Sequence, residues 1–201
     1  MTIEYFNSLA ASWDENYAEK DVAKLEKMAA RIDIEPGSKV IDIGCGTGVL
    51  VPFILKKIGL NGSLVCLDFA AEMLNTARSK GFMGNISYIC ADVTNTGIGD
   101  ATFDAAICYS SFPHFNDKPK ALREINRLLK TEGKLFICHT SSRRTINNIH
   151  GNIPVLNHDI IPDENGMREM LSTAGFIDAA VEDLSHSYFV RAIEGSVITH
   201  V

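Results

Sequence analysis

Short apolar runs alternate with amphipathic segments along most of the chain, and this alternation predicts a parallel sheet with helices on both faces. Five runs are predicted strands, and two weaker candidates follow near the C-terminal end. In chain order they are Lys39–Ile43, Ser63–Leu67, Ile86–Ala91, Phe103–Tyr109 and Lys134–His139, then Ile177–Leu184 and Ser187–Ala192. The pattern therefore indicates an α/β fold.

Helical spacing appears between the predicted strands. In the segment Lys118–Lys130, for example, the apolar residues recur three and four positions apart, so they share one face. Gly81 and Gly175 supply stop signals after two of the segments. The predicted helices are Ala18–Arg31, Val49–Ile58, Ala71–Lys80, Lys118–Lys130 and Asp163–Ala174.

The stretch Ser141–Ile161 breaks this alternation. It is polar, contains Gly151 and Pro154, and has no clean period, which predicts a long loop. Such a loop in a compact domain is usually functional. It follows the fifth predicted strand, on the side where open α/β sheets bind ligands. We therefore expect it to cover a substrate.

Composition excludes several classes of protein. The 201 residues carry a net charge of −6, which disfavours a general nucleic-acid binder because phosphates require a basic face. No apolar run approaches the roughly 20 residues that cross a bilayer, and no signal-like segment opens the chain. The five cysteines never form a CxxC pair, which favours buried thiols in a reducing, cytoplasmic compartment.

The segment Val40–Gly48, VIDIGCGTG, carries the strongest chemical signal. A strand containing Asp42 runs into three glycines and then a helix. Glycines permit positive φ and a close backbone approach, and the helix N-terminus favours a negatively charged group. Dinucleotide enzymes use GxGxxG, whereas the spacing here is GxGxG, with Val49 where their third glycine would stand. The loop predicts a ligand site rather than an ordinary strand–turn–helix corner.

Two acidic residues close the next two predicted strands. Asp68 lies about 20 residues beyond the glycines, the separation at which an acid meets ribose hydroxyls. Alternatively, it caps the helix that follows. Asp92 is placed to accept a hydrogen bond from the amine of adenine, with Phe69, Met73 and Val93 around the ring. The alternative for Asp92 is a simple turn residue.

Together these motifs resemble the class I S-adenosylmethionine-dependent methyltransferase family. The resemblance rests on DIGCGTG, LDFAAEMLNTAR, ADV, FDAAICYSSFPHF and LREINRLLKTEGKLFI, and it spans about Val40–His139, with Gly175-Phe176 extending it. It implies a Rossmann-like, doubly wound sheet of seven strands in the order 3-2-1-4-5-7-6, with the seventh strand antiparallel. It also implies S-adenosylmethionine as methyl donor and S-adenosylhomocysteine as product.

The resemblance also assigns roles to residues. Gly44 and Gly46 would hold the methionine portion of the cofactor, Asp42 would support the loop and the amino group, Asp68 the ribose and Asp92 the adenine. The predicted cofactor site comprises Asp42, Gly44, Cys45, Gly46, Asp68, Phe69, Met73, Asp92, Val93 and Tyr109. The expected single domain divides into an N-terminal lid with helices (1–31), a cofactor-binding core (37–139), a substrate-covering loop (140–162) and a C-terminal helix with a strand pair (163–201).

The N-terminal stretch Tyr5–Tyr17 resembles the lid that many small-molecule members fold over the cofactor. Its Phe6, Trp13 and Tyr17 would then lie against the ligands. The alternative is that these aromatic residues simply pack against the domain.

Methyl transfer requires mainly alignment of the reactants, and a base is needed only if the acceptor must lose a proton. Candidates end the fourth and fifth predicted strands, namely Tyr109, Ser110, Ser111, His114 and His139. His114 and His139 are the predicted catalytic residues. For His114, a structural hydrogen bond is the competing interpretation.

Histidines and arginines are concentrated after the fifth predicted strand, at His139, Arg143, Arg144, His150 and His158. The arginines suit an anionic acceptor, imidazoles also suit a metal, and a solvated loop needs neither. No metal is predicted, because the spacing matches no metal motif. The predicted substrate contacts are Trp13, Tyr17, Arg143, Arg144 and His150.

The acceptor is predicted to be a small molecule. The (N/D)PP(Y/F) motif of base-modifying methyltransferases is absent, since Tyr109–His114 reads YSSFPH. Two alternatives stay open: a nicotinamide-dependent oxidoreductase, and a regulatory module that binds the cofactor without transferring a methyl group. The sequence leaves the acceptor atom and the oligomeric state open.

Overall fold

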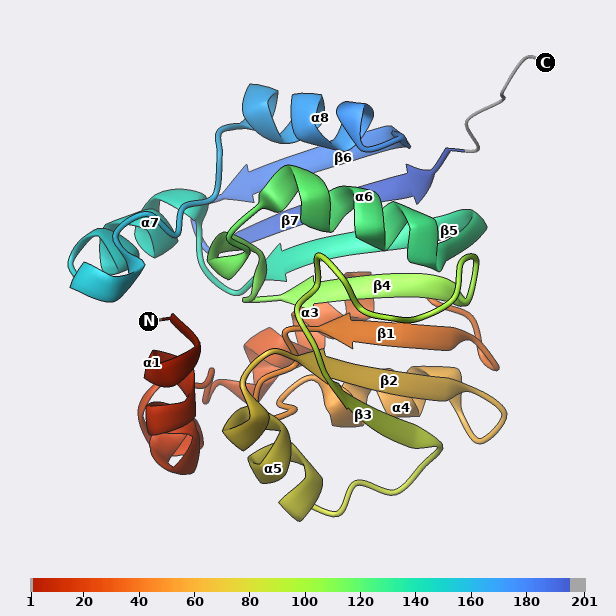
Figure 1. Cartoon of the computed structure of the whole chain (residues 1–201), viewed down its shortest axis with the longest axis horizontal. Helices are drawn as coiled ribbons and strands as arrows, with labels where there is room; N and C mark the ends of the chain where they lie inside the picture. The colour runs from red at the N-terminus through yellow and green to blue at the C-terminus, as the bar shows by residue number, and fades with distance from the viewer. Residues whose placement is uncertain (1, 196–201) are drawn as a thin grey trace.

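A seven-stranded sheet in the order β3-β2-β1-β4-β5-β7-β6 forms the centre of the computed structural model, which describes residues 2–195 (Figure 1). Strands β1 to β5 pair in parallel, and β7 is antiparallel to both neighbours. This arrangement confirms the predicted fold. The strands are β1 (Lys39–Ile43), β2 (Ser63–Asp68), β3 (Ile86–Cys90), β4 (Phe103–Tyr109), β5 (Leu129–His139), β6 (Phe176–Leu184) and β7 (Ser187–Glu194).

Helices cover both faces of the sheet, and a separate hydrophobic cluster lies under each layer. Helices α6 (Lys118–Leu128) and α8 (Glu164–Thr173) cover one face, whereas α3 (Val22–Arg31) and α4 (Val51–Ile58) cover the other. Helix α5 (Ala71–Ser79) packs against β2 and β3. None of the helices within residues 2–195 has the length and apolar character to span a membrane.

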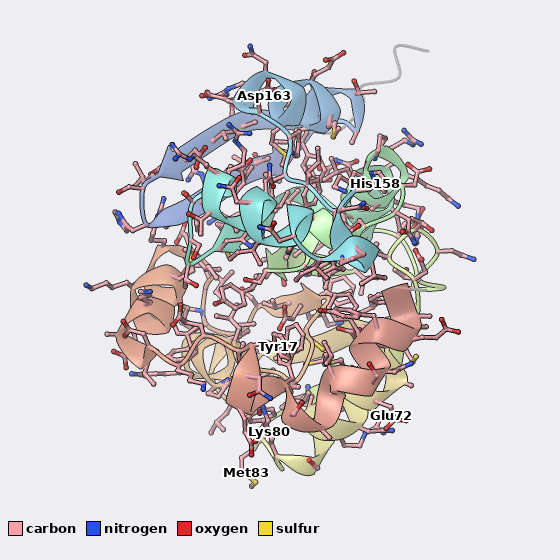
Figure 2. The ribbon with its side chains drawn as sticks, turned by 90° about the vertical axis from the view of Figure 1, so that its left-hand side faces the viewer. Tyr17, Glu72, Lys80, Met83, His158 and Asp163 are labelled. Carbon is pink, nitrogen blue, oxygen red and sulfur yellow. The ribbon has the colours of Figure 1, made fainter. Side chains whose placement is uncertain are left out.

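Two helical parts lie beyond the carboxyl ends of the parallel strands. The N-terminal part comprises α1 (Thr2–Leu9), a 3₁₀ turn η1 (Ala10–Ser12) and α2 (Trp13–Asn16). Across from it lie α7 (Arg143–Gly151) and a 3₁₀ turn η3 (Pro154–Leu156) (Figures 1 and 2). Leu156 of η3 packs in one cluster with Phe6 of α1 and Met73 of α5, so the two parts meet over this end of the sheet.

The prediction that Ser141–Ile161 is a loop without regular structure is wrong, because this segment contains α7 and η3. Helix α7 begins where the Ser142 hydroxyl accepts a hydrogen bond from the Thr145 N–H. Ile146 is its one buried residue, so a helix resting on a single apolar side chain leaves no stripe in the sequence.

Smaller differences have local causes. The first long helix starts at Val22 rather than Ala18, because the Asp21 carboxylate caps it through the N–H groups of Ala23 and Lys24. The prediction that all cysteines are buried is wrong for Cys90, since β3 is an edge strand. Leu129 and Lys130, predicted as the end of a helix, instead open β5.

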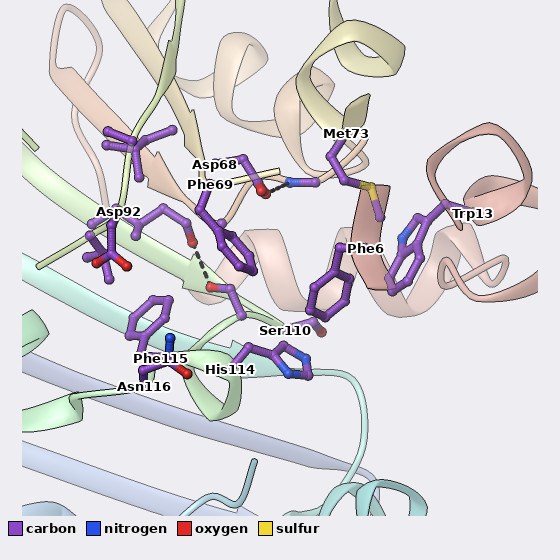
Figure 3. Close-up of a pocket in the computed structure, with 17 residues that line it drawn as sticks. Phe6, Trp13, Asp68, Phe69, Met73, Asp92, Ser110, His114, Phe115 and Asn116 are labelled. Carbon is purple, nitrogen blue, oxygen red and sulfur yellow. Dashed lines mark hydrogen bonds between the residues drawn. The ribbon is translucent and has the colours of Figure 1, made fainter. Parts of the chain in front are cut away.

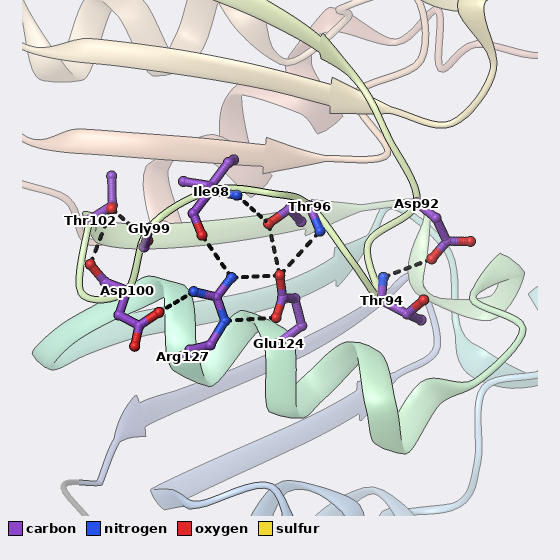
Figure 4. A network of polar contacts seen from close by, with 9 residues as sticks. All are labelled: Asp92, Thr94, Thr96, Ile98, Gly99, Asp100, Thr102, Glu124 and Arg127. Atoms are coloured by element: carbon purple, nitrogen blue, oxygen red, sulfur yellow. Dashed lines mark hydrogen bonds and ion pairs between the residues drawn. The ribbon is translucent and has the colours of Figure 1, made fainter.

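A polar network ties the segment after β3 to α6 (Figure 4). The Glu124 carboxylate accepts hydrogen bonds from the Thr96 N–H and hydroxyl at 3.1 and 2.8 Å. Arg127 donates to both oxygens of Glu124, to Asp100 and to the Ile98 carbonyl. Asp92 begins this segment and accepts a hydrogen bond from the Thr94 N–H at 2.7 Å, two residues before Thr96.

Glu124 should make stability depend on acid pH. Hydrogen bonds from Arg127 hold the pKa of its carboxyl down to about 2. A lowered folded-state pKa stabilises the fold above the ordinary glutamate value of about 4.3, and this contribution is lost as pH falls toward 2. In urea titrations, the free energy of unfolding of Glu124→Gln should therefore fall less between pH 5 and pH 3 than that of wild type. The exposed Glu169→Gln is the control, and equal pH slopes for wild type and Glu124→Gln would contradict the assignment.

Candidate active site

The glycine loop between β1 and α4 adopts the left-handed backbone that its sequence predicts. Gly44 and Gly46 have φ of +69° and +55°. The N–H groups of Gly44 and Cys45 both donate to the Leu67 carbonyl of β2, at 2.7 and 3.1 Å. Ser111, two residues after β4, donates from its hydroxyl to the Ile43 carbonyl at 2.6 Å. The loop is therefore held by β2 and by the segment that follows β4.

Asp68 joins the glycine loop to α5. One carboxylate oxygen accepts from the Gly46 N–H at 2.8 Å and the other from the Ala70 N–H at 2.8 Å. Burial raises the pKa of this carboxyl, while the two N–H groups and His114 oppose that rise. Ala70, not Asp68, occupies the N-cap position of α5. The side chain is thus a bridge between two loops.

A narrow apolar compartment opens beside Asp68 (Figure 3). Phe69, Met73 and Val93 line it, as the sequence suggests. Asp92 lies exposed among the lining residues and accepts a hydrogen bond from the Thr94 N–H at 2.7 Å. The compartment therefore combines an apolar interior with a carboxylate near the glycines and another at its exposed side.

Phe6 of α1 closes this compartment. Its ring makes edge contacts with Phe69, Trp13 and His114, with centroids 5.9, 5.8 and 4.9 Å apart. Figure 3 shows the ring beside the imidazole of His114. These contacts place the N-terminal aromatic residues over the candidate site.

A larger cavity of about 310 Å³ adjoins the first compartment. This volume falls at the lower end of the ~300–1,000 Å³ typical of ligand pockets. Its walls come from the N-terminal part, the glycine loop, the ends of β4 and β5, and α7 with η3. Phe6, Trp13, Gly44, Gly46, Ser110 and His114 line both spaces. Cys45, Tyr109, Tyr17, His139 and His150 line the larger one.

Two histidines of the larger cavity are held neutral. His139 is 4% exposed, and burial together with His114 and His150 lowers its pKa to about 3. Its Nε2 has no hydrogen-bond partner among the described residues. Burial also lowers the pKa of His150, whose Nδ1–H donates to the Asp159 carbonyl at 2.5 Å. At neutral pH both rings present uncharged imidazole to the cavity.

Several predicted site residues lie away from both spaces. Asp42 is buried beneath the loop, where burial and Asp68 raise its pKa to about 7. Arg143 donates from its backbone N–H and Nε to Asp183, at 3.0 and 3.2 Å, and Arg144 is exposed. His158 is exposed as well. Within residues 2–195, no three His, Cys, Asp or Glu side chains form a candidate metal site.

One residue of the site was not singled out from the sequence. Asp159 accepts a hydrogen bond from Nδ1 of His114 at 2.8 Å. It stands in a polar stretch beside His158, where no local pattern distinguishes it. The two partners are 45 positions apart along the chain, a separation that leaves no periodic signal either.

Comparison with known proteins decides the family. Residues 41–137 match a family model described as a methyltransferase domain. Demethylmenaquinone methyltransferase from Corynebacterium kroppenstedtii is 36% identical over 112 residues, which cover 56% of this chain and 46% of that protein. A ubiquinone/menaquinone biosynthesis C-methyltransferase from Shewanella sp. (strain ANA-3) is 33% identical over 147 residues, covering 68% and 57%. The matched segment is a methyltransferase domain of the class I S-adenosylmethionine-dependent family.

The chain spans about half the length of the curated relatives it matches. Solved structures agree on the fold over almost the whole chain. A SAM-dependent methyltransferase from Aquifex aeolicus has a TM-score of 0.75 at 21% identity and covers 94% of this chain and 98% of its own. A Haloferax volcanii methyltransferase, solved in complex with the Trm112 activator, reaches 0.77 at 19% identity, covering 94% and 97%.

The geometry of this candidate site suits S-adenosylmethionine. A Cβ on Gly46 would meet no atom within 4 Å, so the loop leaves room for a ligand against its backbone. The Asp68 carboxylate beside it suits ribose hydroxyls, and the apolar compartment suits a flat base. The Asp68 carboxylate and the rings of Phe6 and Trp13, which lie where the two spaces meet, also suit the positive charge of a sulfonium.

Proposed function

We propose that this chain transfers the methyl group of S-adenosylmethionine to a small-molecule acceptor held in the larger cavity. The supporting observation is that two different spaces meet at one set of residues. The apolar compartment beside Asp68 suits the nucleoside, and the cavity under α7 suits an acceptor. Because both spaces share Gly46, Ser110 and His114, the reacting groups would meet there.

The residues of this chain would act mainly by holding and aligning. Asp68 would bind the ribose, Asp92 the adenine, and the Gly44–Gly46 loop the methionine portion. When bound, the cofactor supplies an activated methyl group for in-line displacement. Phe6, Trp13 and the segment from α7 to η3 would exclude water and fix the acceptor, and such alignment is worth ~7–11 kcal/mol of barrier in favourable cases.

The acceptor is proposed to be small and not a nucleic acid. The larger cavity has a volume of about 310 Å³ and lies between the N-terminal part and α7, which suits a small molecule. The net charge of −6 argues against a phosphate backbone as partner. The five free cysteines favour a reducing, cytoplasmic compartment.

Thermal-shift measurements test this function directly. S-adenosylhomocysteine at 100 times its Kd should stabilise the protein by about 2.7 kcal/mol, and so raise Tm by about 5–10 °C. NAD and NADP at the same concentration should have no effect. Stabilisation by a nicotinamide cofactor alone would overturn the proposal.

Transfer itself requires a second measurement. Methyl-labelled S-adenosylmethionine incubated with the protein and a metabolite extract should label a product that mass analysis identifies. Cofactor binding without any labelled product would instead support the regulatory module.

A further inference from the structure

His114 is held from several sides at the junction of the two spaces. It ends the 3₁₀ turn η2 (Phe112–His114), and its N–H donates to the Ser111 carbonyl at 3.0 Å. Lys118 donates from Nζ to the carbonyls of Pro113 and Phe115, at 2.7 and 3.1 Å. The backbone that carries the imidazole is therefore fixed from both sides.

The imidazole is fixed by Asp159, which comes from the segment after η3. Its carboxylate accepts from Nδ1 of His114 at 2.8 Å, and the two side chains are only 13% and 15% exposed. Nδ1–H of His150 in α7 donates to the backbone carbonyl of Asp159. The centroid of the His150 ring lies 4.8 Å from that of His114. Among the described residues, none forms a hydrogen bond with Nε2 of His114.

This arrangement determines which nitrogen of His114 carries the proton. A carboxylate on Nδ1 favours the tautomer with Nδ1–H, because that hydrogen bond is charge-assisted. The lone pair then resides on Nε2. Enzymes commonly activate a nucleophile with a base that a third group orients. Here His114 has the place of the base and Asp159 that of the orienting group.

We propose that Asp159 is a positioning residue that makes His114 the general base of the reaction. The inference rests on the proposed function, and it limits the acceptor to a nucleophile that bears an acidic O–H, N–H or C–H. The acceptor's X–H bond breaks, its electron pair forms the bond to the methyl carbon, and the proton passes to Nε2 of His114. One positive charge leaves the sulfonium as it becomes a thioether, and one appears on the imidazolium, where the Asp159 carboxylate stabilises it.

The tautomer of His114 can be read without any acceptor. In ¹⁵N-histidine-labelled protein with S-adenosylhomocysteine, NMR should show Nδ1 of His114 protonated and Nε2 unprotonated. Asp159→Asn should populate the opposite tautomer, because the amide can donate to Nδ1. Asp159→Glu retains a carboxylate and should keep the wild-type pattern, which separates loss of the charge from misfolding.

Label transfer into the metabolite extract measures the consequence. Asp159→Asn should lower the rate by the ~10²–10⁴-fold that general base catalysis contributes. His114→Ala should lower it to a similar level while S-adenosylhomocysteine affinity, measured by calorimetry, changes little. The double variant should lose no more than His114→Ala alone, because the two residues act as one unit.

Asn147→Ala is the matched control for a purely structural role of Asp159. Asn147 ties the same segment to α7 through the Ile161 N–H and carbonyl, both at 2.9 Å, without touching His114. It should lower Tm and leave the tautomer of His114 unchanged. Additive losses in the double variant, or an unchanged tautomer in Asp159→Asn, would overturn the proposal. Failure of S-adenosylhomocysteine to bind wild type would instead overturn the proposed function.

Discussion

Asp68→Ala is expected to weaken the binding of S-adenosylhomocysteine by about 10²–10⁴-fold. A hydrogen bond to a charged group contributes ~1.5–3 kcal/mol, and the two ribose hydroxyls can donate two of them. The substitution also releases the Gly46 N–H, which the carboxylate holds at 2.8 Å, so the glycine loop loses one of its hydrogen bonds to β2. The bonds from the Gly44 and Cys45 N–H groups to the Leu67 carbonyl remain, so the loss of affinity should exceed the change in loop geometry.

Isothermal titration calorimetry with S-adenosylhomocysteine measures this loss. Asp92→Ala is the matched control, since Asp92 lines the same compartment but is exposed to solvent. A single exposed hydrogen bond is worth about 1 kcal/mol, so its loss should cost about tenfold or less. Unchanged affinity in Asp68→Ala, or equal losses in both variants, would remove the ribose role of Asp68.

Gly44→Ala should destabilise the fold by about 3 kcal/mol, and so lower Tm by about 6–12 °C. Gly44 has φ of +69°, where a side chain strains the backbone. An added Cβ would also lie 2.4 Å from Cβ of Ser111, which is itself bonded to the Ile43 carbonyl. Either the segment after β4 or the glycine loop must therefore move.

Gly46→Ala separates strain from overcrowding. It shares the positive φ, at +55°, but its Cβ would meet no atom within 4 Å. We expect a cost of only about 1–2 kcal/mol, together with weaker S-adenosylhomocysteine binding because the methyl group enters the ligand's space. Differential scanning calorimetry compares the two variants. Equal melting temperatures would contradict the close packing of Ser111 against Gly44.

Much of the fold follows from local sequence signals. The central strands β1, β2 and β4 are largely apolar runs, and the helices that cover the sheet show apolar residues three and four positions apart, so the pattern predicts both. Turn chemistry adds the boundaries, as at Pro52, which stands in the first turn of α4, and at Gly175 after α8. Helix α7 escaped prediction because it buries only Ile146.

The sequence by itself determined the predicted cofactor site, which is built from the glycine loop and the ends of the strands. The glycine spacing, Asp42, Asp68 and the strand ends are local signals, because tight turns and sheet edges depend on residues close together in the chain. The tertiary structure alone decided which side chains surround the proposed acceptor cavity. It paired His114 with Asp159 and turned Arg143 to Asp183, since contacts between distant segments depend on how α7 packs over the sheet rather than on neighbouring residues. The GxGxG loop therefore indicates the proposed methyl donor from local sequence, while the pairing of His114 with Asp159, on which the proposed general base rests, comes from the tertiary structure.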